Sequence, residues 1–203
     1  MKINLLKIII CFIALLGADY CCAQSMRELA GNERSAAIAE LESKNKSIKS
    51  FTGSFHQTRK TTLLKESVES SGRISFKRDD FILWEYEKPQ AKVIKISGDD
   101  VTVDGARRGK ANRMTKGISN MVSEMLQGGK VVDDKVFDFV IYDNGKSYCV
   151  KAKPIRREMQ RMMAAVDITF NKTDGTVHKI ILTEKDGNCT IIEFDKLKVD
   201  KQK

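Results

Sequence analysis

Apolar and polar residues alternate along five short stretches in the first half of the chain. Alternation with a period of two is typical of a strand that buries one face. Turn-forming segments that contain Asp, Gly or Pro separate the stretches. The five predicted strands cover residues 50–58, 70–78, 81–87, 91–97 and 100–105.

The second half of the chain repeats this pattern with clear turns between its stretches. Five further predicted strands cover residues 135–142, 146–152, 165–170, 176–184 and 188–195. Closely spaced strands joined by short turns predict a meandering antiparallel sheet of about ten or eleven strands. A run of hairpins tends to close or nearly close, because closure removes exposed strand edges. We therefore expect a curved, half-open antiparallel β-barrel.

Three segments depart from the strand pattern and are predicted to be helical. Residues 32–49 carry apolar residues on one side and alternating Glu and Lys on the other. Residues 113–127 place Met121 and Met125 at helical spacing and end at two glycines, which stop helices. Residues 154–163 have room for one or two turns. We expect a mainly β fold with some α, in which helices form a lid over the concave face.

The first 23 residues have the layout of a secretory signal peptide. A short positive segment precedes an apolar run that is too short to span a bilayer, and small residues lead to Ala23. Cleavage after Ala23 would leave residues 24–203 as a single domain, exported to the periplasm. A retained membrane anchor and lipid attachment to a cysteine are the alternatives.

The chain is basic, and the excess charge is spread along it. Its 36 Lys and Arg residues outnumber 27 Asp and Glu residues, which gives +9, and removal of residues 1–23 lowers this to +8. The basic residues form either a solvated rim or a contact for an anionic membrane or acidic partner. We expect no nucleic-acid binding, because no stacking or groove-reading element accompanies the basic runs.

The sequence offers no good candidate for catalysis or metal binding. His56 and His178 are isolated in predicted strands, and the paired aspartates fall in turns. No nucleophile elbow, phosphate-binding glycine loop or zinc motif is present. Cys149 and Cys189 would remain after cleavage, as a disulfide or as two free thiols. We expect a monomer without enzymatic activity, metal or cofactor.

An arginine stands at an unusual place in the second predicted strand. Arg78 follows Ile74 and Phe76 with strand spacing, although a charged residue on an apolar face is costly unless it is paired. Alternatively, the strand ends before Arg78 and its side chain enters solvent.

The segments around Arg78 resemble those of the LolA family, the periplasmic carriers of outer-membrane lipoproteins. The resemblance includes the Phe-x-Gln element at Phe55, the strand from Gly72 to Arg78 and the Trp-x-Tyr element at Trp84. It continues through Pro89 and the turn at Gly98 into the C-terminal strands. Asp79 departs from the proline that often follows the arginine in the family, and residues 101–110 lack its usual aromatic residues.

The resemblance implies a carrier that shuttles lipoproteins, or a related lipid, from the inner to the outer membrane. It implies a cavity that takes up acyl chains, an inner-membrane lipoprotein-releasing ABC transporter complex as donor, and an outer-membrane acceptor. It also implies that Arg78 holds the lid helices closed by hydrogen bonding. The residues expected to line or close the cavity are Arg78, Phe51, Phe55, Ile74, Phe76, Trp84, Tyr86, Ile94, Met121 and Met125.

Three interpretations of this apolar surface remain open. The first is the carrier, in which apolar stripes and flexible methionines form adaptable walls. The second is an envelope sensor that uses the same face to detect lipoproteins or lipids. The third is an exported enzyme that acts on a lipid. For any single residue, ordinary core packing is also an explanation.

Overall fold

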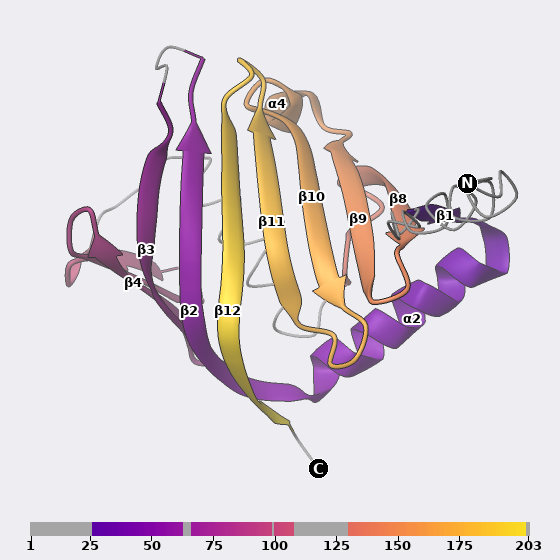
Figure 1. Cartoon of the computed structure of the whole chain (residues 1–203), viewed down its shortest axis with the longest axis horizontal. Coiled ribbons are helices and arrows are strands. Elements are labelled where there is room, and N and C mark those ends of the chain that lie inside the picture. The colour runs from indigo at the N-terminus through magenta and orange to yellow at the C-terminus, as the bar shows by residue number, and fades with distance from the viewer. Residues whose placement is uncertain (1–25, 63–65, 99, 108–129, 202–203) are drawn as a thin grey trace, which may run out of the picture.

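The computed structural model describes residues 26–62, 66–98, 100–107 and 130–201. These residues form one long, curved antiparallel sheet accompanied by a helix that runs along one end of it (Figure 1). The sheet is not closed into a barrel, because no pairing joins β1 to β7 among the described residues. The strands are β1 (Arg27–Leu29), β2 (Ile48–Lys60), β3 (Val68–Lys77), β4 (Phe81–Lys88), β5 (Lys92–Ser97), β6 (Asp100–Val103), β7 (Ala106–Arg107), β8 (Phe137–Asp143), β9 (Ser147–Pro154), β10 (Met163–Asn171), β11 (Val177–Glu184) and β12 (Cys189–Lys201).

The strand order is β1-β8-β9-β10-β11-β12-β2-β3-β4-β5-β6-β7. Two runs of hairpins, β2 to β7 and β8 to β12, are therefore joined where β12 pairs with β2. That pairing is antiparallel and extends from Cys189 opposite Lys60 to Lys201 opposite Ile48, with bulges near its end. The first and last parts of the sequence thus meet in the middle of the sheet (Figure 1).

Two helices accompany the sheet in the described part of the chain. Helix α2 (Gly31–Ser47) passes directly into β2, so the last helical residue and the first strand residue are neighbours in sequence. It buries Ala37, Leu41 and Asn45 against the sheet. Helix α4 (Arg157–Gln160) is a single turn between β9 and β10.

Alternation along the strands divides the sheet into an inner face, toward α2, and an outer face. The inner face holds the core, in which Phe170, Ile74, Ile141 and Ile180 are almost completely buried. The outer face is polar and carries ion pairs such as Lys179 with Glu193. Burying one face and solvating the other is what the period of two in the sequence requires.

All ten predicted strands are present, and the mainly β, half-open architecture is confirmed. The predicted helix at residues 32–49 corresponds to α2, and the turn expected within residues 154–163 corresponds to α4. The short edge strands β1 and β7 were not predicted. The predicted signal peptide and the predicted helix at residues 113–127 lie outside the described residues, so the lid is described only at α2.

The two cysteines of the described residues are not bonded to each other. Cys149 and Cys189 are free thiols on β9 and β12, which are separated by β10 and β11. Burial raises the pKa of the Cys149 thiol.

Among the described residues, no helix has the length and apolarity needed to cross a membrane, and no group of His, Cys, Asp or Glu side chains could hold a metal ion.

Candidate functional site

Arg78 connects the C-terminal end of α2 to the beginning of β2. Its Nε donates to the carbonyl oxygen of Ile48 at 2.7 Å, and one terminal nitrogen donates to the carbonyl oxygen of Asn45 at 2.6 Å. Its backbone N–H donates to the carbonyl of Lys49 at 2.9 Å. One guanidinium group therefore joins the last turn of the helix to the first residue of the strand.

The position of Arg78 suits the chemistry of a helix end. The last carbonyl groups of a helix have no intrahelical donors, and the end carries a partial negative charge that favours a cation. β3 does end at Lys77, as the solvent interpretation of Arg78 required, but the side chain is half-buried and hydrogen-bonded. The expectation that Arg78 contacts the lid is consistent with this geometry.

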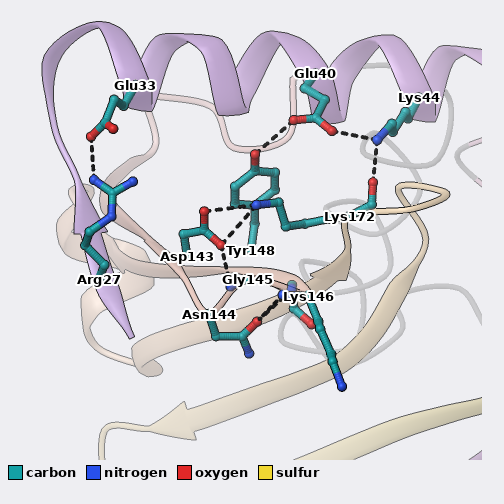
Figure 2. A network of polar contacts seen from close by, with 11 residues as sticks. Arg27, Glu33, Glu40, Lys44, Asp143, Asn144, Gly145, Lys146, Tyr148 and Lys172 are labelled. Atoms are coloured by element: carbon teal, nitrogen blue, oxygen red, sulfur yellow. Dashed lines mark hydrogen bonds and ion pairs between the residues drawn. The ribbon is translucent and has the colours of Figure 1, made fainter. Parts of the chain in front are cut away.

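A second set of polar contacts fixes the middle of α2 to the sheet, as Figure 2 shows. Glu40 accepts a hydrogen bond from the hydroxyl of Tyr148 at 2.9 Å and another from Lys44 Nζ at 2.6 Å. Lys44 also donates to the carbonyl oxygen of Lys172, whose own Nζ lies 2.9 Å from Asp143 Oδ2. We call Glu40, Lys44, Tyr148, Lys172 and Asp143 the polar anchor.

Contacts within the polar anchor favour the charged forms of Glu40, Asp143 and Lys172. The hydrogen bond from Lys44 is the largest effect on Glu40, and with that from Tyr148 it lowers the pKa of the carboxyl. Burial alone would raise the pKa of Asp143, but hydrogen bonds from Lys172 and from the N–H of Gly145 outweigh it and the pKa is lowered. The same contact with Asp143 raises the pKa of Lys172.

The attachment of α2 to the sheet through the polar anchor is therefore expected to weaken at low pH. A carboxyl whose pKa is lowered in the folded protein stabilises it above the pKa of the unfolded chain, about 4 for Asp and Glu. This contribution is lost as pH falls below about 4. Hydrogen exchange in α2, measured from pH 6 to pH 3 after correction for intrinsic rates, should accelerate relative to the central strands.

Two substitutions separate this effect from general acid unfolding. Glu40→Gln should raise exchange in α2 at neutral pH and flatten its pH dependence. Glu42→Gln is the matched control, since Glu42 lies two residues further along the same helix and is not part of the polar anchor. An unchanged pH profile in Glu40→Gln would contradict the assignment.

An aromatic cluster on the inner face extends from β12 and β2 across β3 to β4. The ring of Phe55 contacts Trp84 and Tyr86 edge to face, each at a centroid distance of 5.0 Å. Trp84 also packs on Phe194 at 5.8 Å. We call Phe55, Trp84, Tyr86 and Phe194 the aromatic wall. Edge-to-face pairs at these distances are favourable.

The structure places most of the predicted cavity residues on this inner face. Phe51, Phe55, Ile74 and Phe76 are buried, and Phe51 packs on Phe76 at 5.2 Å. Three others are half-buried and pack on the edge of the core, namely Trp84, Tyr86 and Ile94. Met121 and Met125 lie outside the described residues.

An apolar hollow on the inner face, between β2, β3, β11 and β12, is small. It has a volume of about 20 Å³ and is lined mainly by apolar side chains, including Ile48, Phe51, Ile180 and Leu197. A single water needs about 10–15 Å³ by this measure, whereas sites for small organic ligands occupy about 300–1,000 Å³. This hollow by itself is therefore too small for an acyl chain. The cavity that the sequence predicts includes Met121 and Met125, which lie outside the described residues, so it stays a prediction.

A larger hollow of about 270 Å³ lies over β8, β9 and β10. Val140, Tyr142, Lys151 and Asp167 are among the residues that line it. Cross-strand pairing puts Val140, Lys151 and Asp167 in one row on the outer face. Its mixed charge and its position opposite the aromatic wall make it unsuitable for an acyl chain.

The polar anchor and Phe194 were not found from the sequence. Phe194 follows the alternation of its strand, so pattern alone could have placed it on the inner face. The pair Glu40 and Tyr148 is separated by 108 positions, and nothing in the local pattern connects them.

Comparison with known proteins gives a family match over most of the chain. Residues 46–203 match the family described as outer membrane lipoprotein carrier protein LolA, which includes β2 to β12 and the last residues of α2. No curated protein matches the sequence.

The solved structures to which this chain is similar share little sequence with it. LolA superfamily protein NE2245 from Nitrosomonas europaea is 9% identical, with 84% of this chain and 94% of that chain covered and a TM-score of 0.44. A putative outer membrane lipoprotein-sorting protein domain from Vibrio parahaemolyticus is 12% identical, with 81% and 91% covered and a TM-score of 0.43. MucB in its complex with MucA from Pseudomonas aeruginosa is 14% identical, with 82% and 56% covered and a TM-score of 0.44. The chain therefore spans little more than half of MucB.

Proposed function

This chain belongs to the LolA family, and on that premise we propose that it is a periplasmic carrier for the acyl chains of lipoproteins or a related lipid. In this proposal the aromatic wall binds the acyl chains and α2 is the lid. The lid opens to admit the cargo and closes when the cargo leaves. An inner-membrane releasing complex would supply the cargo, and an outer-membrane acceptor would receive it.

The observation that carries the proposal is the small apolar contact of α2. Ala37 and Leu41 are the buried apolar residues of the helix, and full burial of a leucine contributes about 1.5–3 kcal/mol. Asn45 is buried as well, but its Nδ2 has no hydrogen-bond partner in the described chain, which costs about 1–3 kcal/mol. Among the described residues the lid is thus held mainly by Arg78, by the polar anchor and by Arg34, which donates to the carbonyl oxygen of Phe139 at 3.0 Å and lies over its ring.

The energetics of lipid transfer make an opening lid reasonable. Moving an acyl chain into water costs about 0.8 kcal/mol per CH₂, so three chains of about sixteen carbons would cost on the order of 40 kcal/mol. A few kilocalories spent on separating α2 is small beside this. The cost of separating α2 from the sheet is therefore compatible with a carrier that opens to bind.

A carrier of this kind needs no catalytic group, and we propose that the protein has no enzymatic activity. The two histidines support this proposal, because both are exposed. His56 lies on the outer face, where its Nε2 is 2.7 Å from Glu69. A lipid-modifying enzyme would need a nucleophile and a base beside the aromatic wall.

Trp84 provides a direct test, since it is the single tryptophan of the chain. Diacylglycerol with brominated acyl chains, presented in detergent micelles, should quench Trp84 fluorescence in a saturable way. Ile94→Glu places a charge on the inner face beside Trp84 and should weaken this binding at least tenfold, because the carboxylate would be desolvated. Val93→Glu is the matched control, since Val93 is the next residue and is exposed on the outer face.

Two outcomes would contradict the proposal. One is a wild-type protein whose fluorescence is not quenched. The other is equal loss of binding in Ile94→Glu and Val93→Glu. Identification of proteins that copurify from the periplasm separates carrier from sensor, because a sensor should copurify with a regulator instead of a transport complex.

A further inference from the structure

A polar pair interrupts the inner face at the end of the aromatic wall. The hydroxyl of Tyr86 donates to Gln57 Oε1 at 3.2 Å, and both side chains are half-buried. Gln57 follows Phe55 on the same face of β2 and lies opposite Ile192 of the core. The ring of Tyr86 is part of the wall, in edge-to-face contact with Phe55.

The hydrogen-bond inventory of this pair leaves donors unused. A glutamine side chain has an acceptor oxygen and two N–H donors, and the oxygen is engaged by Tyr86. Gln57 Nε2 makes no hydrogen bond within the part of the chain that the structure describes. Burial raises the pKa of Tyr86, so its hydroxyl remains protonated at neutral pH and can donate. That bond fixes the amide so that Nε2 is available to a ligand.

The surroundings of the pair favour an uncharged ligand group. Arg59, two residues further along β2, has a terminal nitrogen 3.0 Å from Glu184 Oε1, an ion pair without hydrogen-bond geometry. Its charge is therefore largely balanced. Lys92 Nζ lies 4.6 Å from the centre of the Tyr86 ring and is occupied by that cation–π contact.

We propose that Gln57 recognises the carbonyl of the ester or amide that joins an acyl chain to its headgroup, and that Tyr86 positions the Gln57 amide for this contact. The acyl chain then lies along Trp84 and Phe55, and its carbonyl oxygen accepts a hydrogen bond from Gln57 Nε2. This inference rests on the proposed function and adds to it the orientation of the cargo. The headgroup end points along β2 toward Arg59, away from the junction of α2 with β2.

A pair of matched lipids tests the proposal with full-length mature protein. A diacylglycerol and the dialkyl ether with the same chain lengths differ only in their two carbonyl groups. Binding of each is measured by competition with the brominated lipid for quenching of Trp84. Because the ether cannot accept the hydrogen bond that Gln57 donates to the ester carbonyl, the ester should bind about five- to tenfold more tightly than the ether.

Three variants assign the preference to its residues. Gln57→Leu should abolish the preference and leave the affinity for the ether unchanged or higher. Tyr86→Phe keeps the aromatic contact with Phe55 and should reduce the preference without abolishing it. Thr52→Leu is the matched control, since Thr52 is exposed on the other face of β2, and it should keep the wild-type preference.

The results separate this inference from the proposed function. Equal, tight binding of ester and ether by the wild-type protein would overturn the role of Gln57 and leave the carrier intact. An undiminished ester preference in folded Gln57→Leu would do the same. Binding of neither lipid would overturn both. Equal binding of the two lipids by the wild-type protein would overturn the role of Gln57 even if Gln57→Leu does not fold.

Discussion

Replacing Arg78 by leucine is expected to tighten lipid binding about tenfold and to slow transfer of lipid to acceptor vesicles. In the proposed function α2 is the lid, so the binding of cargo depends on the population of the open form. Apparent affinity is the intrinsic affinity scaled by the population of the competent form. Arg78 hydrogen-bonds to Asn45 on the helix and Ile48 on the strand, and its loss removes contacts that favour closure.

The same substitution should destabilise the protein without cargo. Hydrogen bonds to charged groups contribute about 1.5–3 kcal/mol, and for a half-buried side chain we expect a total loss of about 2–3 kcal/mol. In a protein of this size that corresponds to a fall in Tm of roughly 5–10 °C, measurable by calorimetry. Arg78→Lys keeps the charge but has no planar fork to reach both carbonyls, and should lie between leucine and wild type.

Lys77→Leu is the matched control for Arg78. Lys77 is the preceding residue, is exposed, and forms a surface ion pair with Asp80 at 2.9 Å. Such pairs contribute about 0–1 kcal/mol, and neither lipid affinity nor transfer should change. If Arg78→Leu folds and binds lipid no more tightly than wild type, Arg78 does not hold the lid.

Gly72→Ala is expected to cost the protein about 3 kcal/mol or more of its free energy of unfolding. An added Cβ would lie 2.0 Å from the carbonyl oxygen of Glu85 and 2.9 Å from the Cα of Tyr86, both backbone atoms of β4. The register of β3 and β4 shifts just before Gly72. Backbone atoms cannot move aside as the end of a flexible side chain could, so the two strands must separate.

Chemical denaturation measures this loss, and Ser75→Ala on the same strand is its control. Ser75→Ala should change the free energy of unfolding by less than about 0.5 kcal/mol, as substitutions of exposed or half-exposed side chains usually do. Because Tyr86 lies opposite Gly72, Gly72→Ala should also alter Trp84 fluorescence in the folded state. A stability equal to wild type would show that the close approach at Gly72 is not required.

The predicted fold followed from features that are local in sequence. Several strands, such as β3 and β10, have segments in which apolar and polar positions alternate, and α2 has helical spacing, so their positions could be read from the pattern. β1 and β7 have three and two residues, too few for a period to appear. The meeting of β12 with β2 was not specified, because pairing across more than 100 positions leaves no local trace.

The candidate site was predictable only in part. Phe55, Trp84 and Tyr86 could be placed on one face from alternation, and the resemblance to LolA directed attention to Arg78. The partners of Arg78 are backbone carbonyls, which any residues at positions 45 and 48 would provide, so side-chain identity could not indicate them. The small size of the hollow depends on how closely side chains of β2, β3, β11 and β12 pack, and periodicity does not encode this packing.

The uninterrupted passage from α2 to β2 has a mechanical consequence. A helix of 17 residues is about 25 Å long, so a rotation of about 20° at Ser47 would carry its first turn through about 9 Å. The helix would thus rotate about its C-terminal end, where Arg78 is hydrogen-bonded, and the largest displacement would be at its N-terminal end, next to β1. Since β1 pairs with β8 at only three residues and joins α2 through Ala30, that swing would peel β1 from the sheet edge. A spin label at exposed Ser35 would travel several times further than one at Ser47.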